Sequence, residues 1–313
     1  MRTSFDTRDL QPSSGGSVVS VGVFDGVHLG HRAILAANLE LAHKLGAEPT
    51  VLTFRRHPKS LLLGHAPRTL TTLDHRLELF QRAGIEHAVA LTFDQSLSEL
   101  SAEDFAARYL VEGLGAKALV LGFDSKFGHG RRGTPELMRT LGYEVEVVGR
   151  VEVLGRAVSS TAIREAVELG DLESAERMLG RPVSVIGHVV HGEARGRTIG
   201  FPTANLDLHH ELHPPVGVYA CRARLLGERV DEPESSELLN AVANIGYRPT
   251  VEDEQPSSPR VEVHLFDFDG DLYDRRLELS FVKRLRGEQR FDGLEALVAQ
   301  IELDCKDARI VLA

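Results

Sequence analysis

The first half of the chain alternates short apolar runs with amphipathic, helix-like stretches, and this alternation constrains the fold more than any other feature. Alternating strands and helices pack as a parallel sheet with helices on both faces, because parallel neighbours need a crossover connection. We therefore expect a doubly wound α/β domain over residues 1–182, with strands at Val18–Phe24, Thr50–Phe54, His87–Phe93, Ala118–Gly122 and Glu144–Val148.

The rhythm changes after Arg181-Pro182, which ends the last helical stretch of this half. Short strand-like runs separated by turn residues then predict a small antiparallel sheet or β-barrel over residues 183–313. A terminal helix capped by Asp292 and Glu295 is expected to follow. The expected strands are Val185–His191, Val216–Leu225, Leu239–Ile245, Arg260–Phe268 and Leu277–Leu285.

The charge and the cysteines exclude several classes of protein. A net charge of −10 over 313 residues argues against a general binder of nucleic acid or of a membrane surface. No apolar run approaches the ~20 residues of a membrane span, and Met1–Gly16 lacks the apolar core of a signal peptide. Cys221 and Cys305 are far apart and have no metal-site spacing, so we expect a reduced, cytoplasmic setting.

The segment His28-Leu29-Gly30-His31 follows the first strand directly and opens a helical run. Two imidazoles at a strand-to-helix turn can converge on one phosphate, Gly30 allows the backbone to approach closely, and the helix N-terminus adds a partial positive charge. Ligands of parallel sheets bind at this edge. The alternative is a structural or surface role for the two histidines.

Three further segments point to the same edge of the sheet. Thr53–Pro58 and Gly122–Gly133 follow strands, and a third segment begins a helix with Ser160, Thr161 and Arg164. Hydroxyls and backbone N–H groups at a helix start suit phosphate oxygens, and the arginine adds a charge-assisted contact. Plain N-capping by either hydroxyl is the alternative. Taken with the histidines, the three segments favour a nucleotide site.

The chemistry that these segments predict is nucleotidyl transfer, in which a phosphate attacks the α-phosphorus of ATP and pyrophosphate leaves. Such transfer depends on positioning and on stabilisation of charge, so it needs no covalent nucleophile. His28 and His31 would donate hydrogen bonds to the α-phosphate, and Arg164 would hold the departing pyrophosphate. Asp124 would fix a ligand hydroxyl or a neighbouring loop.

A glycine-rich segment, Gly192–Asn205, carries the first candidate site of the second half. It lacks the Lys-Ser/Thr ending of a P-loop. Thr203 and Asn205 are two residues apart, and in an extended strand they would share one face. Their hydroxyl and amide oxygens can bind Mg²⁺ beside the phosphates of ATP. Ordinary turn chemistry is the alternative.

Glu262 lies in an alternating strand pattern, Val261–Leu265, that places it and His264 opposite three apolar residues. A carboxylate there can be the general base for an alcohol that attacks the γ-phosphate of ATP. A solvent-facing glutamate is the alternative. The acidic turn Asp267–Asp271 lacks the spacer and final glutamate of a calcium loop, so we reject calcium binding.

In this order the motifs resemble those of the prokaryotic bifunctional riboflavin kinase/FAD synthetase family. The resemblance runs from about Ser17 to the C-terminus and implies an N-terminal, Rossmann-like FMN adenylyltransferase domain and a C-terminal riboflavin kinase barrel. The kinase would phosphorylate riboflavin to FMN with ATP and Mg²⁺, and the adenylyltransferase would join FMN to ATP, giving FAD and pyrophosphate. The motifs are Gly22–His31, Ser159–Arg164, Gly200–Asn205 and Val261–Leu265.

The same resemblance implies a role for each candidate residue. Glu262 would be the kinase base, and Thr203 and Asn205 would hold the nucleotide and Mg²⁺. His28, His31 and Arg164 would carry adenylyl transfer. The other residues expected to bind nucleotide or substrate are Gly22, Phe24, Asp25, Gly30, Asp124, Ser160, Thr161, Gly192 and Gly200.

The chain departs from the family pattern at two positions of the first domain. Arg56 stands where the family usually has proline, and Ser125 stands where it usually has phenylalanine. One alternative is therefore a riboflavin kinase with a degenerate adenylyltransferase domain. Two others are a nucleotide-binding regulator without turnover and an adenylyltransferase for a different phosphate ester. A homo-oligomer stays open.

Overall fold

The computed structural model describes residues 1–6, 10–64, 68–191, 199–208, 211–228, 237–247 and 260–313. They form two compact units, Met1–Ser160 and Thr161–Ala313. This division lies before the boundary expected at residue 182, because α7 (Ser160–Leu169) and α8 (Leu172–Leu179) group with the second unit. The boundary at residue 182 between the two activities stays a prediction.

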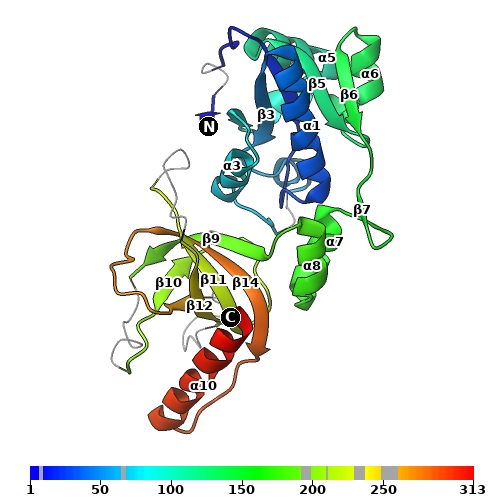
Figure 1. The fold of residues 1–313 in the computed structure, drawn as a ribbon. Coiled ribbons are helices and arrows are strands. Elements are labelled where there is room, and N and C mark those ends of the chain that lie inside the picture. The colour runs from blue at the N-terminus through cyan, green and yellow to red at the C-terminus, as the bar shows by residue number, and fades with distance from the viewer. Residues whose placement is uncertain (7–9, 65–67, 192–198, 209–210, 229–236, 248–259) are drawn as a thin grey trace. The chain divides into compact units, whose positions relative to one another are not determined.

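The first unit is built on a six-stranded sheet in which every neighbouring pair of strands is parallel (Figure 1). The strand order β1-β4-β3-β2-β5-β6, with helices between the strands, confirms the doubly wound fold. The edge strand β1 was not predicted. The strands are β1 (Arg2–Ser4), β2 (Ser17–Val21), β3 (Glu48–Phe54), β4 (His87–Leu91), β5 (Ala116–Gly122) and β6 (Glu144–Val148).

Both faces of this sheet are buried. Val18 packs with residues of α1 (Leu29–Leu45), whereas Val19, the next residue along β2, belongs to a second apolar cluster. That cluster includes side chains of α5 (Ala102–Phe105) and of the π-helical segment η2 (Ala106–Gly113). Successive side chains of a strand point to opposite faces, so strands buried on both faces read as continuous apolar runs.

The remaining elements of the first unit are short. The helix α5 begins at a side-chain cap, in which Ser101 Oγ accepts a hydrogen bond from the Asp104 backbone N–H at 3.0 Å. The other elements are α2 (Lys59–Leu63), α3 (Leu73–Arg82), α4 (Gln95–Glu99), η3 (His129–Arg131), α6 (Pro135–Thr140), β7 (Glu152–Val153) and β8 (Arg156–Ala157).

The second unit contains a closed antiparallel barrel, with strand order β10-β13-β12-β11-β14-β9, as predicted. The helix α10 (Leu294–Leu312) packs against the barrel through Ala308 and Leu312. It begins after Gly293 without a side-chain cap, so the expected cap by Asp292 is wrong. The strands are β9 (Val183–Val190), β10 (Ala204–Asp207), β11 (Gly217–Leu225), β12 (Leu239–Gly246), β13 (Arg260–Leu265) and β14 (Arg276–Arg286).

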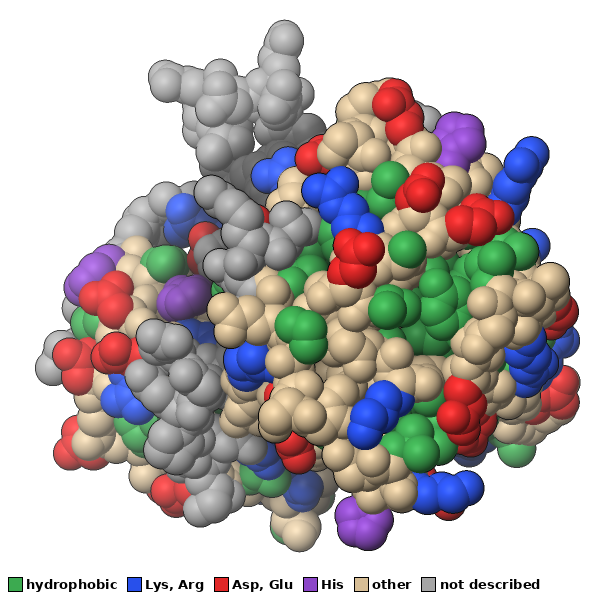
Figure 2. Space-filling model, turned by 90° about the horizontal axis from the view of Figure 1, so that it is seen from above, with side chains coloured by type: hydrophobic (Ala, Val, Ile, Leu, Met, Phe, Trp, Pro, Cys, Tyr) green, Lys and Arg blue, Asp and Glu red, His purple; other side chains and the backbone are tan. Residues whose placement is uncertain are grey.

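The surface carries charges of both signs. On the face shown in Figure 2, acidic and basic side chains are interspersed around a patch of hydrophobic side chains. Among the helices that the structure describes, none is both long and apolar enough to cross a membrane.

Candidate active sites

The carboxyl end of β2 is the place where the strand order of the parallel sheet reverses. The strands β3 and β4 lie on one side of β2, and β5 and β6 lie on the other. Connections that leave in opposite directions open a crevice at such a point, and ligands of α/β sheets bind there. The turn that follows β2, residues 22–28, therefore occupies the position expected of a binding loop.

The backbone of this turn is strained. Phe24 and Val27 have φ angles of 53° and 38°, and Gly26 has a φ of 81°. A positive φ at a residue other than glycine costs about 1–3 kcal/mol and persists only where the surroundings hold it. A Cβ at Gly22 would lie 3.1 Å from the ring of Phe24. Gly22 and Phe24 thus shape the turn by close packing.

Polar contacts hold the turn from two other segments of the unit. The Thr71 backbone N–H donates to Asp25 Oδ1 at 3.1 Å, and Thr71 Oγ1 accepts from the Gly26 N–H at 2.9 Å. Ser160 Oγ donates to the Asp25 carbonyl at 2.9 Å. Asp25 and Ser160, both predicted site residues, are therefore joined by a hydrogen bond that fixes the loop.

His28 and His31 lie against each other at the start of α1. His28 is the N-cap, and its Nδ1 accepts a hydrogen bond from the His31 backbone N–H at 3.3 Å. The two rings stack with centroids 3.6 Å apart. Gly30 leaves room for the pair, since a Cβ there would lie 3.2 Å from His28 Cε1. Because Nδ1 is an acceptor, neutral His28 carries its proton on Nε2 and can donate it to a ligand.

The environment of His31 keeps this imidazole neutral. Burial lowers the pKa of His31 well below its usual value, and the neighbouring His28 and Arg76 lower the pKa further. Two stacked imidazolium cations would repel each other, which agrees with this direction. Among the described residues, the buried Nδ1 of His31 has no hydrogen-bond partner. Such unpaired buried atoms are typical of sites that a ligand or water completes.

We expect the lowered pKa of His31 to make the protein less stable in mild acid. In the unfolded chain this imidazole takes up a proton near its ordinary pKa of 6.5, whereas in the folded chain it stays neutral to lower pH. Below the ordinary pKa of histidine, the unfolded chain therefore binds more protons than the folded chain. The free energy of unfolding then falls by up to about 1.4 kcal/mol per pH unit from this group.

Urea unfolding at a series of pH values between neutrality and mild acid measures this slope. In His31→Phe, which keeps a flat ring but cannot titrate, the slope should be smaller. An identical slope in the variant and the parent would contradict a low pKa of His31.

Arg76, on α3, is buried beside the turn and was not predicted as a site residue; its exposed fraction is 3%. Its guanidinium donates to the Val23 carbonyl at 2.7 Å, to Thr53 Oγ1 at 2.9 Å and to the Phe54 carbonyl at 2.9 Å. Burial lowers the pKa of Arg76 to about 10, so the side chain remains charged near neutral pH. The sequence has no helical pattern that distinguishes Arg76 from its neighbours, because every residue from His75 to Phe80 is buried.

Asp124 lies in an exposed turn after β5, close to α1. A Cβ at Gly122 would lie 3.6 Å from Asp124 Oδ1 and 3.2 Å from Ile34 Cδ1. This places Asp124 beside the helix that the histidines begin. Of the two departures from the family pattern, Ser125 is half-buried in this turn and Arg56 is exposed after β3.

Thr161 and Arg164 lie on α7, three residues apart, and belong to the second unit. Thr161 is exposed and Arg164 is half-buried. Ser160 is the first residue of the same helix and bonds to the turn of the first unit. The roles of Thr161 and Arg164 at phosphate stay predictions.

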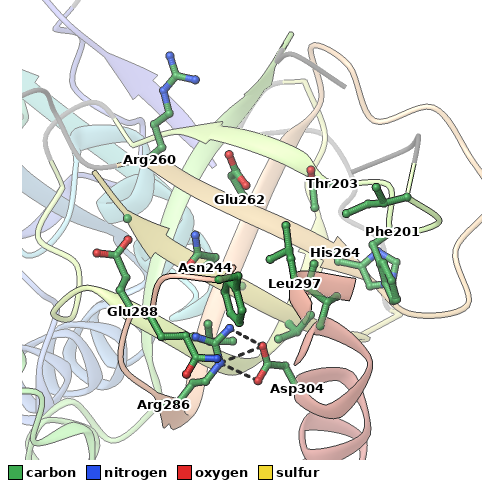
Figure 3. Close-up of a pocket in the computed structure, with 18 of the residues that line it drawn as sticks. Phe201, Thr203, Asn244, Arg260, Glu262, His264, Arg286, Glu288, Leu297 and Asp304 are labelled. Carbon is green, nitrogen blue, oxygen red and sulfur yellow. Dashed lines mark hydrogen bonds and ion pairs between the residues drawn. The ribbon is translucent and has the colours of Figure 1, made fainter. Parts of the chain in front are cut away.

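A cavity of about 460 Å³ lies in the second unit, between the barrel wall and α10, and Thr203, Asn205 and Glu262 all line it (Figure 3). Asn205 on β10 is the register partner of Glu262 on β13, and Asn244 on β12 is the partner of Glu262 on its other side. Directly opposed residues of antiparallel strands share a face. The carboxylate therefore lies between two amides on the cavity side of the barrel.

The segment that leads into β10 is anchored near Thr203. His264 Nδ1 donates to the Pro202 carbonyl at 2.8 Å, and the ring of Phe201 meets the His264 ring edge-on with centroids 5.6 Å apart. His264, which alternation predicted on the same side of β13 as Glu262, thus positions the residues beside Thr203.

Two glycines of this segment, Gly192 and Gly200, were predicted to be site residues. Gly200 has a φ of 87°, a conformation that favours glycine, and a Cβ there would meet open space. Its role is therefore in the backbone turn. Gly192 lies outside the described residues.

The opposite wall of the cavity, at the end of β14 and on α10, consists of residues that were not predicted to be site residues. Arg286, at the end of β14, pairs with Asp304 of α10 through three N–O contacts of 2.7, 2.8 and 3.1 Å (Figure 3). Asp304 is only 5% exposed. Leu297, Ile301 and Asp304 follow helical spacing on α10 and line the cavity together. A carboxylate that continues an apolar stripe was the sequence signal for this wall.

The cavity combines a polar side with an apolar side. The carboxylate and amides of the barrel face space that is bordered on α10 by Leu297 and Ile301 and, in the segment before it, by Phe291. Its volume falls within the roughly 300–1,000 Å³ of small-molecule sites. A cavity of this size with a polar and an apolar side suits a small molecule that has both polar and apolar parts.

The fold combines a doubly wound unit with a barrel unit, each of which carries a candidate site, and the comparisons with known proteins make the chain a phosphate-transferring enzyme. Two family models match the chain, riboflavin kinase over residues 179–312 and FAD synthetase over residues 10–162. The chain belongs to the bifunctional riboflavin kinase/FMN adenylyltransferase family, and both enzymatic domains of that family are present.

Bifunctional riboflavin kinase/FMN adenylyltransferases from several bacteria align with nearly the whole chain. The protein from Pseudomonas fluorescens is 40% identical, over 97% of this chain and 96% of its own length. The protein from Bacillus subtilis is 36% identical, over 96% and 93%. The protein from Escherichia coli K12 is 38% identical, over 96% and 94%.

A solved structure has the same fold over the whole chain. It is a macrolide-efflux protein from Streptococcus pneumoniae, with a TM-score of 0.83, 32% identity and coverage of 99% of both chains. Its name refers to a different activity from the names of the family models and the relatives above.

Proposed function

We propose that the barrel unit phosphorylates riboflavin with ATP to give FMN, and that the doubly wound unit adenylylates FMN with a second ATP to give FAD and pyrophosphate. The observation that carries the proposal is that Glu262 shares one cavity with Thr203 and Asn205. The histidine pair at the switch point of the other unit supports the second activity. We place the enzyme in the cytoplasm, where its free cysteines would stay reduced.

In the barrel, Glu262 would act as the general base. Its carboxylate would accept the proton of the ribityl 5′-hydroxyl while that oxygen attacks the γ-phosphorus and the bond from phosphorus to ADP breaks. Asn205 and Asn244, its register partners, would orient the carboxylate and the polar tail of the substrate. The apolar side of the cavity, with Phe291 and Leu297, would take the flavin ring.

The oxygens of Thr203 and Asn205 fit a magnesium site. Mg²⁺ prefers oxygen ligands, keeps several waters and is usually bound with the phosphates of the substrate. In the described ranges no group of three or more His, Cys, Asp or Glu residues is arranged to hold a metal. The hydroxyl of Thr203 and the amide of Asn205 would be ligands to the cation. The cation would neutralise charge on the β- and γ-phosphates of ATP.

In the doubly wound unit, His28 would donate from Nε2 to the α-phosphate of ATP as the phosphate of FMN attacks. The new bond joins the FMN phosphate oxygen to the α-phosphorus, and the bond to pyrophosphate breaks. Donors fixed before the reaction stabilise the developing charge without reorganisation. Stacking against His31 and the bond to the His31 backbone N–H fix His28 in this way.

The flavin products formed over time test the proposal. Purified protein is incubated with riboflavin, ATP and Mg²⁺, and the flavins are separated by chromatography; a chelator serves as the control. FMN should appear first and FAD later, and neither should form with the chelator. FMN without FAD, even when FMN and ATP are supplied directly, would favour the kinase with a degenerate first domain. Formation of neither flavin would overturn the whole proposal.

A further inference from the structure

We propose that Arg76 is a positioning residue for adenylyl transfer. Its buried guanidinium joins the end of β3 to the start of the turn at residues 22–28, and it thereby fixes the positions of His28 and His31. This inference rests on the proposed function of the first unit. It concerns a residue that would touch neither ATP nor FMN, and it acts through the backbone of the turn.

The hydrogen bonds of Arg76 join the carboxyl ends of two adjacent strands, β2 and β3, beside the switch point. One guanidinium nitrogen donates to the Val23 carbonyl at 2.7 Å and to Thr53 Oγ1 at 2.9 Å, and another donates to the Phe54 carbonyl at 2.9 Å. Val23 lies directly after the Gly22 that leaves β2, and Phe54 is the last residue of β3. A single planar group therefore sets the spacing of these two strand ends.

The position of Val23 matters because strained backbone begins at the next residue. Phe24, Gly26 and Val27 all have positive φ angles, and His28 follows at once. A strained turn keeps its shape only where its surroundings over-determine it. Thr71, which precedes α3, bonds to Asp25 and to the Gly26 N–H, and Arg76 on α3 bonds to Val23, the residue before the strained part of the turn. The same short segment of chain thus fixes the turn at two points.

The charge of Arg76 also acts on the histidine pair. It lowers the pKa of His31, together with burial and with His28, whose ring stacks on that of His31. The ring of Phe24 covers another side of His31, with centroids 5.2 Å apart. Replacing the guanidinium with a neutral side chain would remove the contribution of Arg76 to the lowered pKa of His31. The change in this titration reports the loss of the charge, whereas a loss of rate in Arg76→Lys, which keeps the charge, reports the loss of the hydrogen-bond geometry.

Three variants of the full chain separate these roles. Arg76→Lys keeps the charge but cannot make all three hydrogen bonds. Arg76→Met removes the charge and the hydrogen bonds. Arg139→Met is the matched control, because Arg139 is an exposed arginine on α6 of the same unit and also donates to a backbone carbonyl, that of Val145 at 2.9 Å. For each variant, FMN formation from riboflavin reports on the barrel unit, and FAD formation from supplied FMN reports on the first unit.

We expect Arg76→Lys to lower kcat for FAD formation by about 10-fold with little change in KM for ATP, because a small misplacement of fixed groups costs rate. Its pH–rate profile should match that of the parent. Arg76→Met should lose about 100-fold in kcat, and the acid side of its pH–rate profile for FAD formation should move to higher pH, because His31 loses a neighbouring positive charge that lowers its pKa. FMN formation should stay within twofold of the parent in both, and Arg139→Met should leave both activities unchanged.

Each other result has a definite meaning. FAD formation within twofold of the parent in Arg76→Lys would overturn the proposal, and so would an unshifted profile in Arg76→Met. If Arg76→Met loses FMN formation as well, the chain has misfolded, and Arg76→Lys alone decides. A parent enzyme that makes no FAD would refute the proposed function of the first unit, which is a separate failure.

Discussion

Replacing His28 with alanine is expected to lower kcat for FAD formation by about 100- to 1,000-fold, the usual effect of removing one fixed donor to a developing negative charge. Nδ1 of His28 accepts the hydrogen bond of the His31 backbone N–H, so the neutral ring carries its proton on Nε2. FMN formation should be unaffected, since its residues line a cavity of the other unit. Initial rates with riboflavin and with supplied FMN measure the two activities separately.

His43→Ala is the matched control for this experiment. His43 is an exposed histidine in the last turn of the same helix, so its loss tests whether any histidine on α1 matters. It should leave FAD formation unchanged. Equal loss of FMN and FAD in His28→Ala would contradict two separate sites, and full retention of FAD formation would remove His28 from the mechanism.

The second large effect is expected for Glu262→Gln, which should lower kcat for FMN formation by about 100- to 10,000-fold, the contribution of a general base. The substitution keeps the size of the side chain and its place between Asn205 and Asn244. It removes the ability to take a proton. FAD formation from supplied FMN should proceed at the parent rate, the reverse of the His28 result.

Glu302→Gln controls for the loss of a carboxylate from the second unit, because Glu302 is exposed on α10 and does not line the cavity. It should retain both activities. Riboflavin phosphorylation at the parent rate in Glu262→Gln would show that this carboxylate is not the base. A loss confined to KM for riboflavin would assign it to substrate binding instead.

Most of the fold could be predicted because its signals are local. The buried parallel strand β4 reads as a continuous apolar run over residues 88–91, and the helix beginning at Leu29 shows an apolar stripe. The strands β1 and β10 were not predicted, since they have only three and four residues. Too few side chains alternate in such a strand to give a period. The pairing that closes the barrel joins residues far apart in the chain.

The candidate sites were predictable where the chemistry lies in one segment. The convergence of His28 with His31 and the shared face of Thr203 and Asn205 follow from spacing alone. The roles of Arg76, Asn244 and Asp304 depend on neighbours brought together by the tertiary fold. The guanidinium of Arg76, for example, bonds to Val23, which lies 53 positions away. No local pattern carries that information.

The barrel's cavity depends on the position of one helix, which the ion pair between Arg286 and Asp304 holds against β14. One side of the cavity is the wall of the closed barrel, whose strands support one another. The other side is α10, which is joined to β14 by a short exposed stretch around Glu288 and Arg290. Proteolysis there would release α10 from its covalent tether and leave the parallel sheet intact. Because α10 borders the cavity of the barrel, this cut is expected to lower vitamin phosphorylation. Dinucleotide assembly, which is assigned to the other unit, should be retained.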